Sequence, residues 1–214
     1  MTLQINELFH SIQGESIWAG LPCSFVRLTG CNLRCRYCDT TYAYDSGKPM
    51  QLRQIMQALS KFDCRRITIT GGEPLLQSRT LELIHDLLRK DYRVSLETNG
   101  SLDIQSVDNG CMIVMDLKCP SSDMRHHNRL ENLRYLKQSD QLKFVIADRG
   151  DYLFARDIIK QDVHHLPGAN VLFSPAFGTM PPKLLADWIL ADGIDVRLQL
   201  QLHRFIWPDR DKGV

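Results

Sequence analysis

Three cysteines within eight residues carry the most distinctive chemistry of this chain. Cys31, Cys35 and Cys38 are spaced four and then three residues apart, on a loop that follows an apolar stretch ending at Leu28. Thiolates at this spacing can wrap one metal cluster, but they provide one ligand fewer than an iron–sulfur cluster normally takes from a protein. A [4Fe–4S] cluster held by three cysteines keeps one iron free to bind another molecule, so the spacing predicts a reactive cluster.

Three other uses of these thiols stay open at this point. A structural zinc site closes with four cysteine or histidine ligands, and no fourth such residue follows Cys38 at the usual spacing. A disulfide framework is typical of small secreted proteins, whereas this chain has 214 residues and seven cysteines. Redox chemistry of the thioredoxin type needs only Cys35 and Cys38 and leaves Cys31 without a role.

The composition is that of an ordinary globular protein. Hydrophobic residues make up 43% of the chain, and the formal net charge of +1 gives no reason to expect a nucleic-acid or membrane surface. Residues 1–10 lack the basic start and apolar run of a signal peptide, and no stretch approaches the ~20 apolar residues that cross a bilayer. Four further cysteines lie in or beside apolar segments, at Cys23, Cys64, Cys111 and Cys119. We therefore expect a single domain over residues 1–214, in a reducing cytoplasm.

Apolar, β-branched runs alternate with amphipathic helical patterns along the chain. The expected strands lie at residues 24–28, 66–70, 93–97, 112–116, 142–147 and 171–173. Apolar stripes typical of helices lie within residues 52–59, 77–90, 130–136, 153–159 and 184–189. This alternation predicts an α/β fold with a mainly parallel sheet and right-handed crossovers, either an open sheet or a partial barrel.

Polar turns marked by glycine or proline follow five of these strands. Because ligands in parallel α/β folds bind beyond the carboxyl ends of the strands, we expect the turns to meet at one rim. They lie at residues 30–31, 70–74, 97–100, 116–120 and 174–175. A last strand is expected at 196–202, where apolar and polar residues alternate, and its wet face predicts a position at the sheet edge.

The cysteine motif, together with Gly71-Gly72-Glu73-Pro74, resembles the radical S-adenosylmethionine superfamily. The resemblance implies a partial (β/α)6-type barrel in a short form, whose open iron is chelated by the amino and carboxylate groups of the methionine moiety. Reduction of the cluster then cleaves the sulfonium and yields a 5′-deoxyadenosyl radical, so no side chain is expected to carry the chemistry itself. Glycines at the rim let the backbone approach the methionine amino group closely.

Five further segments resemble one family of that superfamily, the 7-carboxy-7-deazaguanine synthases. They are residues 9–16, 25–28, 38–40, 116–121 and 201–203. The resemblance implies ring contraction of 6-carboxy-5,6,7,8-tetrahydropterin to 7-carboxy-7-deazaguanine with loss of ammonia, on the way to queuosine and related deazapurines. S-adenosylmethionine would be regenerated in each turnover and would act as a cofactor.

The same resemblance assigns residues to four ligands. Cys31, Cys35 and Cys38 would hold the cluster, and Thr40 would bind Mg²⁺, which prefers oxygen ligands and keeps several waters. Residues assigned to the pterin are Ile12, Gln13, Gly14, Glu15, Arg27 and Thr70. Residues assigned to S-adenosylmethionine are Tyr37, Cys38, Asp39, Gly72, Cys119, Pro120, Ser121, Ser174, Pro175, Ala176 and Phe177.

Several of these assignments have a plainer alternative. Thr40 could simply cap a turn after Asp39. Arg27 could form a surface ion pair instead of a bidentate fork on the substrate carboxylate. Ser121 stands where related sequences often carry lysine, a departure that weakens its own assignment. His203 either faces the substrate pocket or pairs with a neighbour.

The expected partners are the pterin, an electron donor such as flavodoxin or ferredoxin, and a second copy of the chain in a homodimer, with no nucleic acid and no membrane. Two other functions stay open. An activase that makes a glycyl radical on a partner protein shares the cysteine motif, but not the segment Ser-Ile-Gln-Gly-Glu at residues 11–15. An iron–sulfur electron carrier would need four protein ligands for each cluster.

Overall fold

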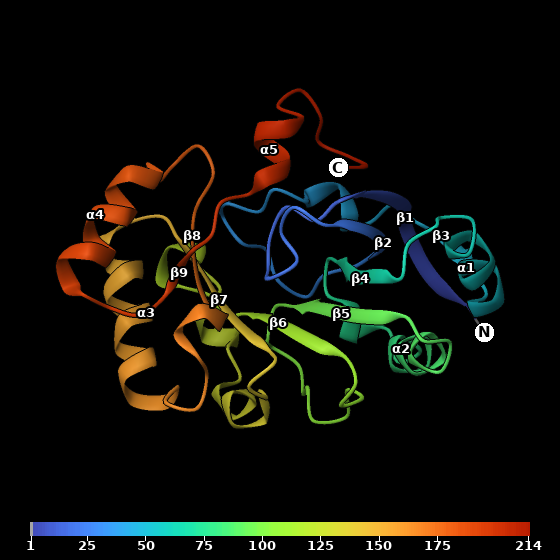
Figure 1. The fold of residues 1–214 in the computed structure, drawn as a ribbon, viewed down its shortest axis with the longest axis horizontal. Helices are drawn as coiled ribbons and strands as arrows, with labels where there is room; N and C mark the ends of the chain where they lie inside the picture. Colours follow the sequence, from blue (N-terminus) through green and yellow to red (C-terminus); the bar gives the residue numbers. More distant parts are fainter. Residues whose placement is uncertain (1) are drawn as a thin grey trace.

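The computed structural model describes residues 2–214 (Figure 1), so Met1, the first residue of the expected domain, lies outside the described residues. Within this range one open sheet has the strand order β3-β1-β2-β4-β5-β6-β7-β8-β9. The strands are β1 (Leu3–Ile12), β2 (Pro22–Leu28), β3 (Lys48–Met50), β4 (Arg66–Gly71), β5 (Arg93–Thr98), β6 (Met112–Asp116), β7 (Gln141–Ile146), β8 (Val171–Pro175) and β9 (Arg197–Leu198). The α-helices are α1 (Leu52–Leu59), α2 (Thr80–Leu88), α3 (Arg149–Asp162), α4 (Pro182–Asp192) and α5 (Leu202–Ile206).

The strands β2, β4, β5, β6, β7, β8 and β9 run parallel to one another, whereas β1 pairs antiparallel with both β2 and β3. The edge strands β3 and β9 are not hydrogen-bonded to each other, so the sheet curves without closing. In Figure 1, α1 and α2 lie at one end of the sheet and α3 and α4 at the other. The expected fold class, a partial barrel with mainly parallel strands, is confirmed.

Each parallel strand turns one apolar face toward the helices and a more polar face toward the inside of the curve. In β4, Ile67 and Ile69 belong to the hydrophobic core, whereas Thr70 lines the internal cavity. In β7, Phe144 belongs to the core and Lys143 lines the cavity. Because successive side chains of a strand point to opposite faces, several strands deliver polar groups to the same cavity.

Residues 99–140, all of which the structure describes, contain no α-helix, which keeps the domain short. The apolar pattern at 130–136 predicted a helix, but the structure forms the 3-10 helix Leu130–Tyr135 there. The reason is visible in the spacing, because Leu130, Leu133 and Leu136 recur every three residues, which is the period of a 3-10 helix. Leu133 and Leu136 are buried and Leu130 is exposed.

The strand expected at 196–202 is wrong beyond Leu198. Only Arg197 and Leu198 pair with β8, at the predicted edge position. The chain then leaves the sheet, because the Leu202 N–H donates to the Gly14 carbonyl at 3.0 Å and α5 begins at that residue. A tertiary contact near the cavity thus overrides the alternating pattern.

The strand β1 was not among the expected elements, although it forms the antiparallel arm that presents residues 12–15 to the cavity. Its residues alternate poorly in burial, since both faces are partly covered. Among residues 2–214, no helix is long and apolar enough to cross a membrane.

Candidate active site

A cavity of about 780 Å³ lies at the carboxyl ends of the parallel strands. Its wall includes the three motif cysteines, the end of β1, the C-terminal ends of β4 and β5, and side chains of α5 and the tail. Every residue assigned to the site from the sequence lines this cavity except Cys119 and Pro120. The structure therefore brings together segments that are up to two hundred residues apart in the sequence.

The cysteine loop is fixed where it leaves β2 by its packing against the end of β4. The Glu73 N–H donates to the Gly30 carbonyl at 2.8 Å, and the Gly72 N–H donates to the Leu28 carbonyl at 3.2 Å. A Cβ at Gly72 would overlap the Gly30 carbonyl oxygen and the Cys31 Cβ. Glycine is therefore required at this position by the close approach of two backbones.

The three motif thiols are half-buried and free of disulfides. Cys31 Sγ accepts from the Leu33 N–H at 3.4 Å and is 3.9 Å from Asn99 Nδ2. Burial raises the pKa of both the Cys31 and Cys35 thiols, so bound metal must drive their deprotonation. Hydrogen-bond donors that point at Cys31 Sγ would stabilise its thiolate form. The loop with its three thiols therefore suits the binding of a cluster.

Among residues 2–214, no three histidine, cysteine or acidic side chains converge on the position of a single metal ion. Cys31, Cys35 and Cys38 would hold a cluster of several irons, whose ligands need not meet at one point.

Glu73 is a buried carboxylate that ties the glycine turn to β5. It accepts from the Leu75 N–H at 2.9 Å, the Thr98 hydroxyl at 2.9 Å and the Asn99 N–H at 2.7 Å. Burial raises the pKa of Glu73, and these donors work in the opposite direction. The side chain is fully buried and does not line the cavity, so it orients the loop.

A second polar network spans β1, β4 and β5 inside the cavity. Gln13 Nε2 donates to Glu97 Oε1 at 3.3 Å, and the Thr70 hydroxyl donates to Glu97 Oε2 at 2.7 Å. Burial raises the pKa of the Glu97 carboxyl, and nearby Glu15 raises it further. This carboxylate therefore carries an energetic penalty when charged, which a donor from a ligand would relieve.

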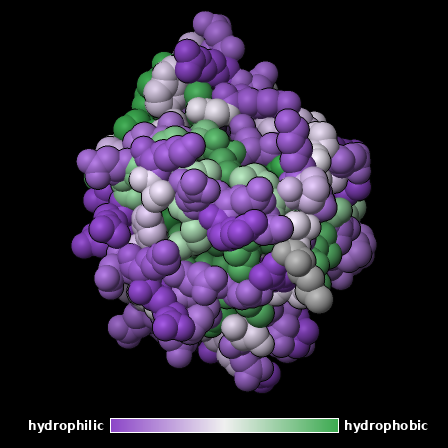
Figure 2. All heavy atoms as spheres, turned by 90° about the vertical axis from the view of Figure 1, so that its right-hand side faces the viewer, coloured by the Kyte–Doolittle hydropathy of each residue, from purple (hydrophilic) through white to green (hydrophobic). Residues whose placement is uncertain are grey.

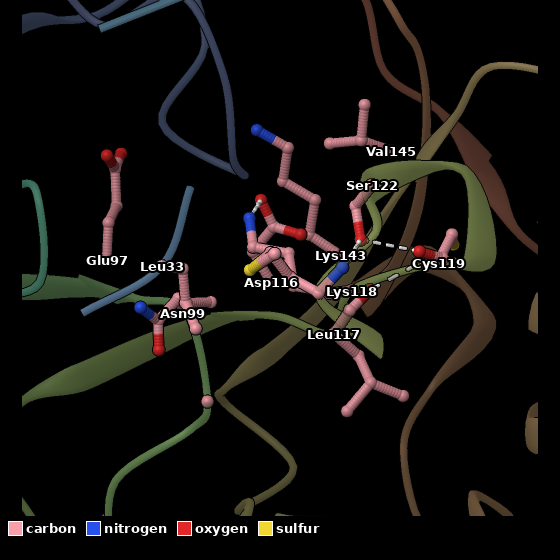
Figure 3. A network of polar contacts seen from close by, with 12 residues as sticks. Leu33, Glu97, Asn99, Asp116, Leu117, Lys118, Cys119, Ser122, Lys143 and Val145 are labelled. Atoms are coloured by element: carbon pink, nitrogen blue, oxygen red, sulfur yellow. Dashed lines mark hydrogen bonds and ion pairs between the residues drawn. The ribbon is translucent and has the colours of Figure 1, made fainter. Parts of the chain in front are cut away.

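Two lysines whose side chains are only 12% exposed were not predicted as site residues. Lys143 Nζ lies 2.6 Å from Glu15 Oε2, with side-chain exposures of 12% and 14%. Lys118 Nζ lies 2.9 Å from Asp116 Oδ2. Figure 3 shows these side chains: Asp116 comes from the end of β6, Lys118 from the loop after β6, and Lys143 from β7. For Lys143, the sequence did contain a signal, because a lysine within the apolar strand β7 is unusual.

Burial alone would favour neutral lysines at these positions. For Lys143, the carboxylates of Glu15 and Asp116 outweigh burial and raise its pKa above the usual value. For Lys118, Asp116 and the cluster thiols have the same effect on its pKa. Both lysines are therefore positive at neutral pH, inside a cavity where water screens charge poorly.

Arg27 does form the ion pair of the plainer alternative. Its Nε lies 2.7 Å from Glu7 Oε1, and the two side chains are 13% and 18% exposed, so the pair is partly buried. The guanidinium also lies over the rings of Phe9 and Tyr42, with 5.7 Å and 5.8 Å to the centroids. Since Arg27 still lines the cavity, its assignment to the substrate stays a prediction.

Thr40 and Asp39 lie where the cysteine loop meets the C-terminal segment. The Thr40 hydroxyl donates to Asp39 Oδ1 at 2.9 Å, as the turn alternative expected. Gln201 Nε2 donates to Asp39 Oδ2 at 2.9 Å. Thr40 lines the cavity, so a role as a Mg²⁺ ligand stays compatible with its position.

The residues assigned to the cofactor divide into two groups. Cys119 is fully buried in the hydrophobic core, and Pro120 lies off the cavity wall. Ser121 lines the cavity, and both its N–H and its hydroxyl bond to Asp151. Residues 174–177, at the C-terminal end of β8 and directly after it, also line the cavity.

Buried polar atoms without a partner gather at this cavity. Within residues 2–214, five of seven such side-chain atoms belong to cavity residues, namely Glu15 Oε1, Asp116 Oδ1, Ser174 Oγ, Gln201 Oε1 and Arg204 Nε. Buried polar atoms in folded proteins are normally paired. Their concentration here indicates that the cavity is built for a polar ligand.

Comparisons with known proteins identify the class of this site. Residues 25–141, more than half of the chain, match the Radical SAM superfamily, and the protein belongs to that superfamily. Membership implies a [4Fe–4S] cluster and S-adenosylmethionine as the cofactors of this chain.

Curated relatives narrow the class further. The chain is 44% identical to 7-carboxy-7-deazaguanine synthase from Chlorobaculum tepidum, over 99% of this chain and 97% of the relative. It is 42% identical to 7-carboxy-7-deazaguanine synthase from Koribacter versatilis, over 99% of this chain and all of the relative. The protein is a member of the 7-carboxy-7-deazaguanine synthase family.

Solved structures agree on the fold. The crystal structure of QueE from Escherichia coli superposes with a TM-score of 0.78 over 95% of each chain, at 19% sequence identity. The structure of Streptococcus suis SuiB bound to S-adenosylmethionine gives a TM-score of 0.54 over 79% of this chain and 48% of that one, at 13% identity.

Proposed function

We propose that this chain converts 6-carboxy-5,6,7,8-tetrahydropterin into 7-carboxy-7-deazaguanine and ammonia, in one domain that spans residues 1–214. The observation that carries the proposal is one cavity in which the cysteine motif meets buried charged side chains from several strands. Family membership over nearly the full length of two relatives supports the same reaction.

The cluster and the cofactor would occupy the side of the cavity formed by the cysteine loop. Cys31, Cys35 and Cys38 would hold the cluster, and Gly72 would leave the backbone open to the methionine end. Bound together, the cluster and S-adenosylmethionine supply a 5′-deoxyadenosyl radical. The chain's own residues supply binding, orientation and electrostatics.

The pterin would occupy the side formed by β1, β5 and β7. Lys143 and Arg27 offer cations for a carboxylate. Glu15 Oε1 is buried without a partner and would accept from an N–H group of the pterin ring. Glu97 offers a second acceptor, whose raised pKa makes a donor from the ligand favourable.

The C-terminal segment would exclude water from the bound pterin. His203 packs on Gly14, where any Cβ would overlap its imidazole ring. Arg204 bonds to Asp211 at 3.0 Å, and the Gly213 N–H donates to Glu7 at 3.2 Å. These contacts would hold residues 201–214 over the mouth of the cavity. Several side chains of this segment line the cavity, whereas Pro208 does not.

Three finer assignments belong to this proposal. Mg²⁺ would bind Thr40, with substrate oxygens and water as its other ligands. The physiological electron donor would be a flavodoxin or a ferredoxin. A homodimer would form through the short edge strand β9. Light scattering of the purified protein would give its mass and so distinguish a dimer from a monomer.

The test is a product analysis with anaerobically reconstituted protein. It would contain the carboxy-tetrahydropterin, dithionite, Mg²⁺ and S-adenosylmethionine at a concentration below that of the pterin. We expect 7-carboxy-7-deazaguanine and ammonia in excess over S-adenosylmethionine, measured by mass spectrometry. Absence of the deazapurine would reject the proposal, and product limited to one equivalent of S-adenosylmethionine would reject the regeneration step.

A further inference from the structure

An exposed basic surface lies beside the cysteine loop, and of its residues only Arg36 also lines the cavity. It consists of Asn32, Arg34 and Arg36 from the loop and of residues 123–129 from the segment after β6, and we call it the cluster-loop surface. The sequence showed Met-Arg-His-His at 124–127 followed by Arg129, but gave this segment no role. Only the fold places it next to the cysteines.

Hydrogen bonds join the two parts of the cluster-loop surface. The Arg36 N–H donates to the Ser122 carbonyl at 3.2 Å, and the Arg34 N–H points at Met124 Sδ at 3.4 Å. Arg36 Nε lies 3.6 Å from Asp123 Oδ2. The segment 122–129 is therefore held against the residues that separate the three cluster ligands.

The charges on this surface do not cancel. Four exposed arginines, Arg34, Arg36, Arg125 and Arg129, face two exposed aspartates, Asp103 and Asp123, which leaves an excess of two positive charges. That excess is larger than the net charge of +1 of the whole chain. Arg36 and Asp123 are 73% and 63% exposed, so their pair is held weakly and can be exchanged for partners on another protein.

The cluster must receive one electron from outside before it can act, and hydrogen bonds join this surface to the loop that carries the three cysteines. We infer that the cluster-loop surface is the docking site for an acidic one-electron carrier protein. This inference rests on the proposed radical function. In the transfer the carrier is oxidised by one electron and the cluster is reduced by one electron, and no bond forms or breaks.

Electrostatics of this kind act mainly on the rate of association. A small, polar interface is typical of transient electron-transfer complexes. Complementary charge steers their encounter, and the effect declines with ionic strength. A partner with carboxylates around its redox group would meet Arg125, which lies over the Phe154 ring, and Arg129, which lies 3.8 Å from Asp103, at the rim of the contact.

The test compares a protein reductant with a small one. The probe is reduced flavodoxin, and the readout is the rate of cluster reduction in a stopped-flow instrument, without any pterin present. Arg125→Glu/Arg129→Glu should slow reduction by flavodoxin at least about tenfold at low ionic strength. Reduction by dithionite should stay within about twofold of the parent protein, and the two flavodoxin rates should converge at high salt.

Matched controls separate docking from other effects. Arg53→Glu/Arg89→Glu makes the same charge change on the face of α1 and α2, shown in Figure 2, where both arginines line a different groove. This variant should keep the parental rate with both reductants. Arg125→Gln/Arg129→Gln removes charge without reversing it, and it should give an intermediate rate with flavodoxin.

Three results would overturn the inference. The first is an unchanged flavodoxin rate in Arg125→Glu/Arg129→Glu at low salt. The second is an equal loss with dithionite, which would mean that the cluster itself is disturbed. The third is an equal loss in Arg53→Glu/Arg89→Glu, which would mean that net charge matters and the location does not. Failure of the proposed function would show differently, as a missing deazapurine product with dithionite.

Discussion

The cavity at the carboxyl ends of the strands and the groove between α1 and α2 are hollows of similar size, about 780 Å³ and 710 Å³. Their chemistry differs. The cavity contains desolvated charges, such as Lys143 paired with Glu15, whereas the charged residues of the groove include the exposed Arg53, Arg89 and Lys90. Charges in water are screened and interact weakly, while buried charges interact strongly and select a ligand. Volume alone therefore does not define a site.

Among the variants that test this comparison, removal of one cluster ligand should have the largest effect on activity. Cys35→Ala should abolish both the brown colour of the reconstituted protein and its turnover, because two thiolates cannot replace three. Absorbance spectra and iron content measure the first effect, and product formation measures the second. Cys111→Ala is the control, since this cysteine is buried in the core away from the cavity and its variant should keep the colour. Activity in Cys35→Ala would contradict the cluster assignment.

Removing a buried cation should have the next largest effect. Lys143→Met would leave Glu15 charged and unpaired, which should lower the free energy of unfolding by about 3 kcal/mol and kcat/KM by about a hundredfold. Urea unfolding and steady-state kinetics measure the two effects. In the double variant Glu15→Gln/Lys143→Met, stability should recover while activity should not. Recovery of activity would show that the pair has only a structural role.

Removing the proposed Mg²⁺ ligand should have a smaller effect. Thr40→Ala should lower turnover about tenfold at limiting Mg²⁺ and less at saturating Mg²⁺, because water can replace a single hydroxyl ligand. Titration of the rate with Mg²⁺ measures this, with the exposed neighbour variant Thr41→Ala as the control. A parental rate that chelation of Mg²⁺ does not change would require Thr40 to be reassigned.

The pH dependence of cluster assembly should be more modest. Burial raises the pKa of Cys31 and Cys35, so both thiols are largely protonated at neutral pH and must lose protons when iron binds. Iron and sulfide uptake by the apoprotein should therefore speed up several-fold between about pH 7 and about pH 8. The rate at which the cluster absorbance appears measures this dependence. A rate that fell with rising pH would show that thiol deprotonation is not the limiting step.

Changes in the groove should have almost no effect. Arg53→Glu should leave kcat/KM unchanged and shift the free energy of unfolding by no more than about 0.5 kcal/mol, since Arg53 is exposed. A clear loss of turnover in this variant would mean that the groove takes part in function and that the comparison with the cavity is wrong.

The residues that local spacing could reveal were largely found before the structure. The cysteine motif, the glycine turn at 71–72 and the polar ends of the strands all lie on the cavity wall. The apolar, β-branched runs also predicted β2 and the parallel strands from β4 to β8 within a few residues of their boundaries. What local pattern could not reveal was any pairing between distant residues, such as Lys143 with Glu15, 128 positions apart.

The errors have the same origin. The alternation at 196–202 is a valid strand pattern, but bonds from Gln201 and Leu202 to the cysteine loop and to Gly14 pull the chain out of the sheet. Cys119 lies within the expected rim turn at 116–120, yet its side chain is buried in the core. In each case a tertiary contact decided between two local conformations of similar energy.

By itself, the sequence determined the parallel α/β architecture and predicted both the cysteine motif as the cluster site and the rim as the place for ligands, because each depends on residue type and short-range spacing. Only the tertiary structure decided which charges are buried together, how the tail covers the cavity, and that a basic segment ninety residues away lies against the cysteine loop. The physical reason is that desolvation and long-range pairing depend on what surrounds a residue in three dimensions, and no local pattern contains that information.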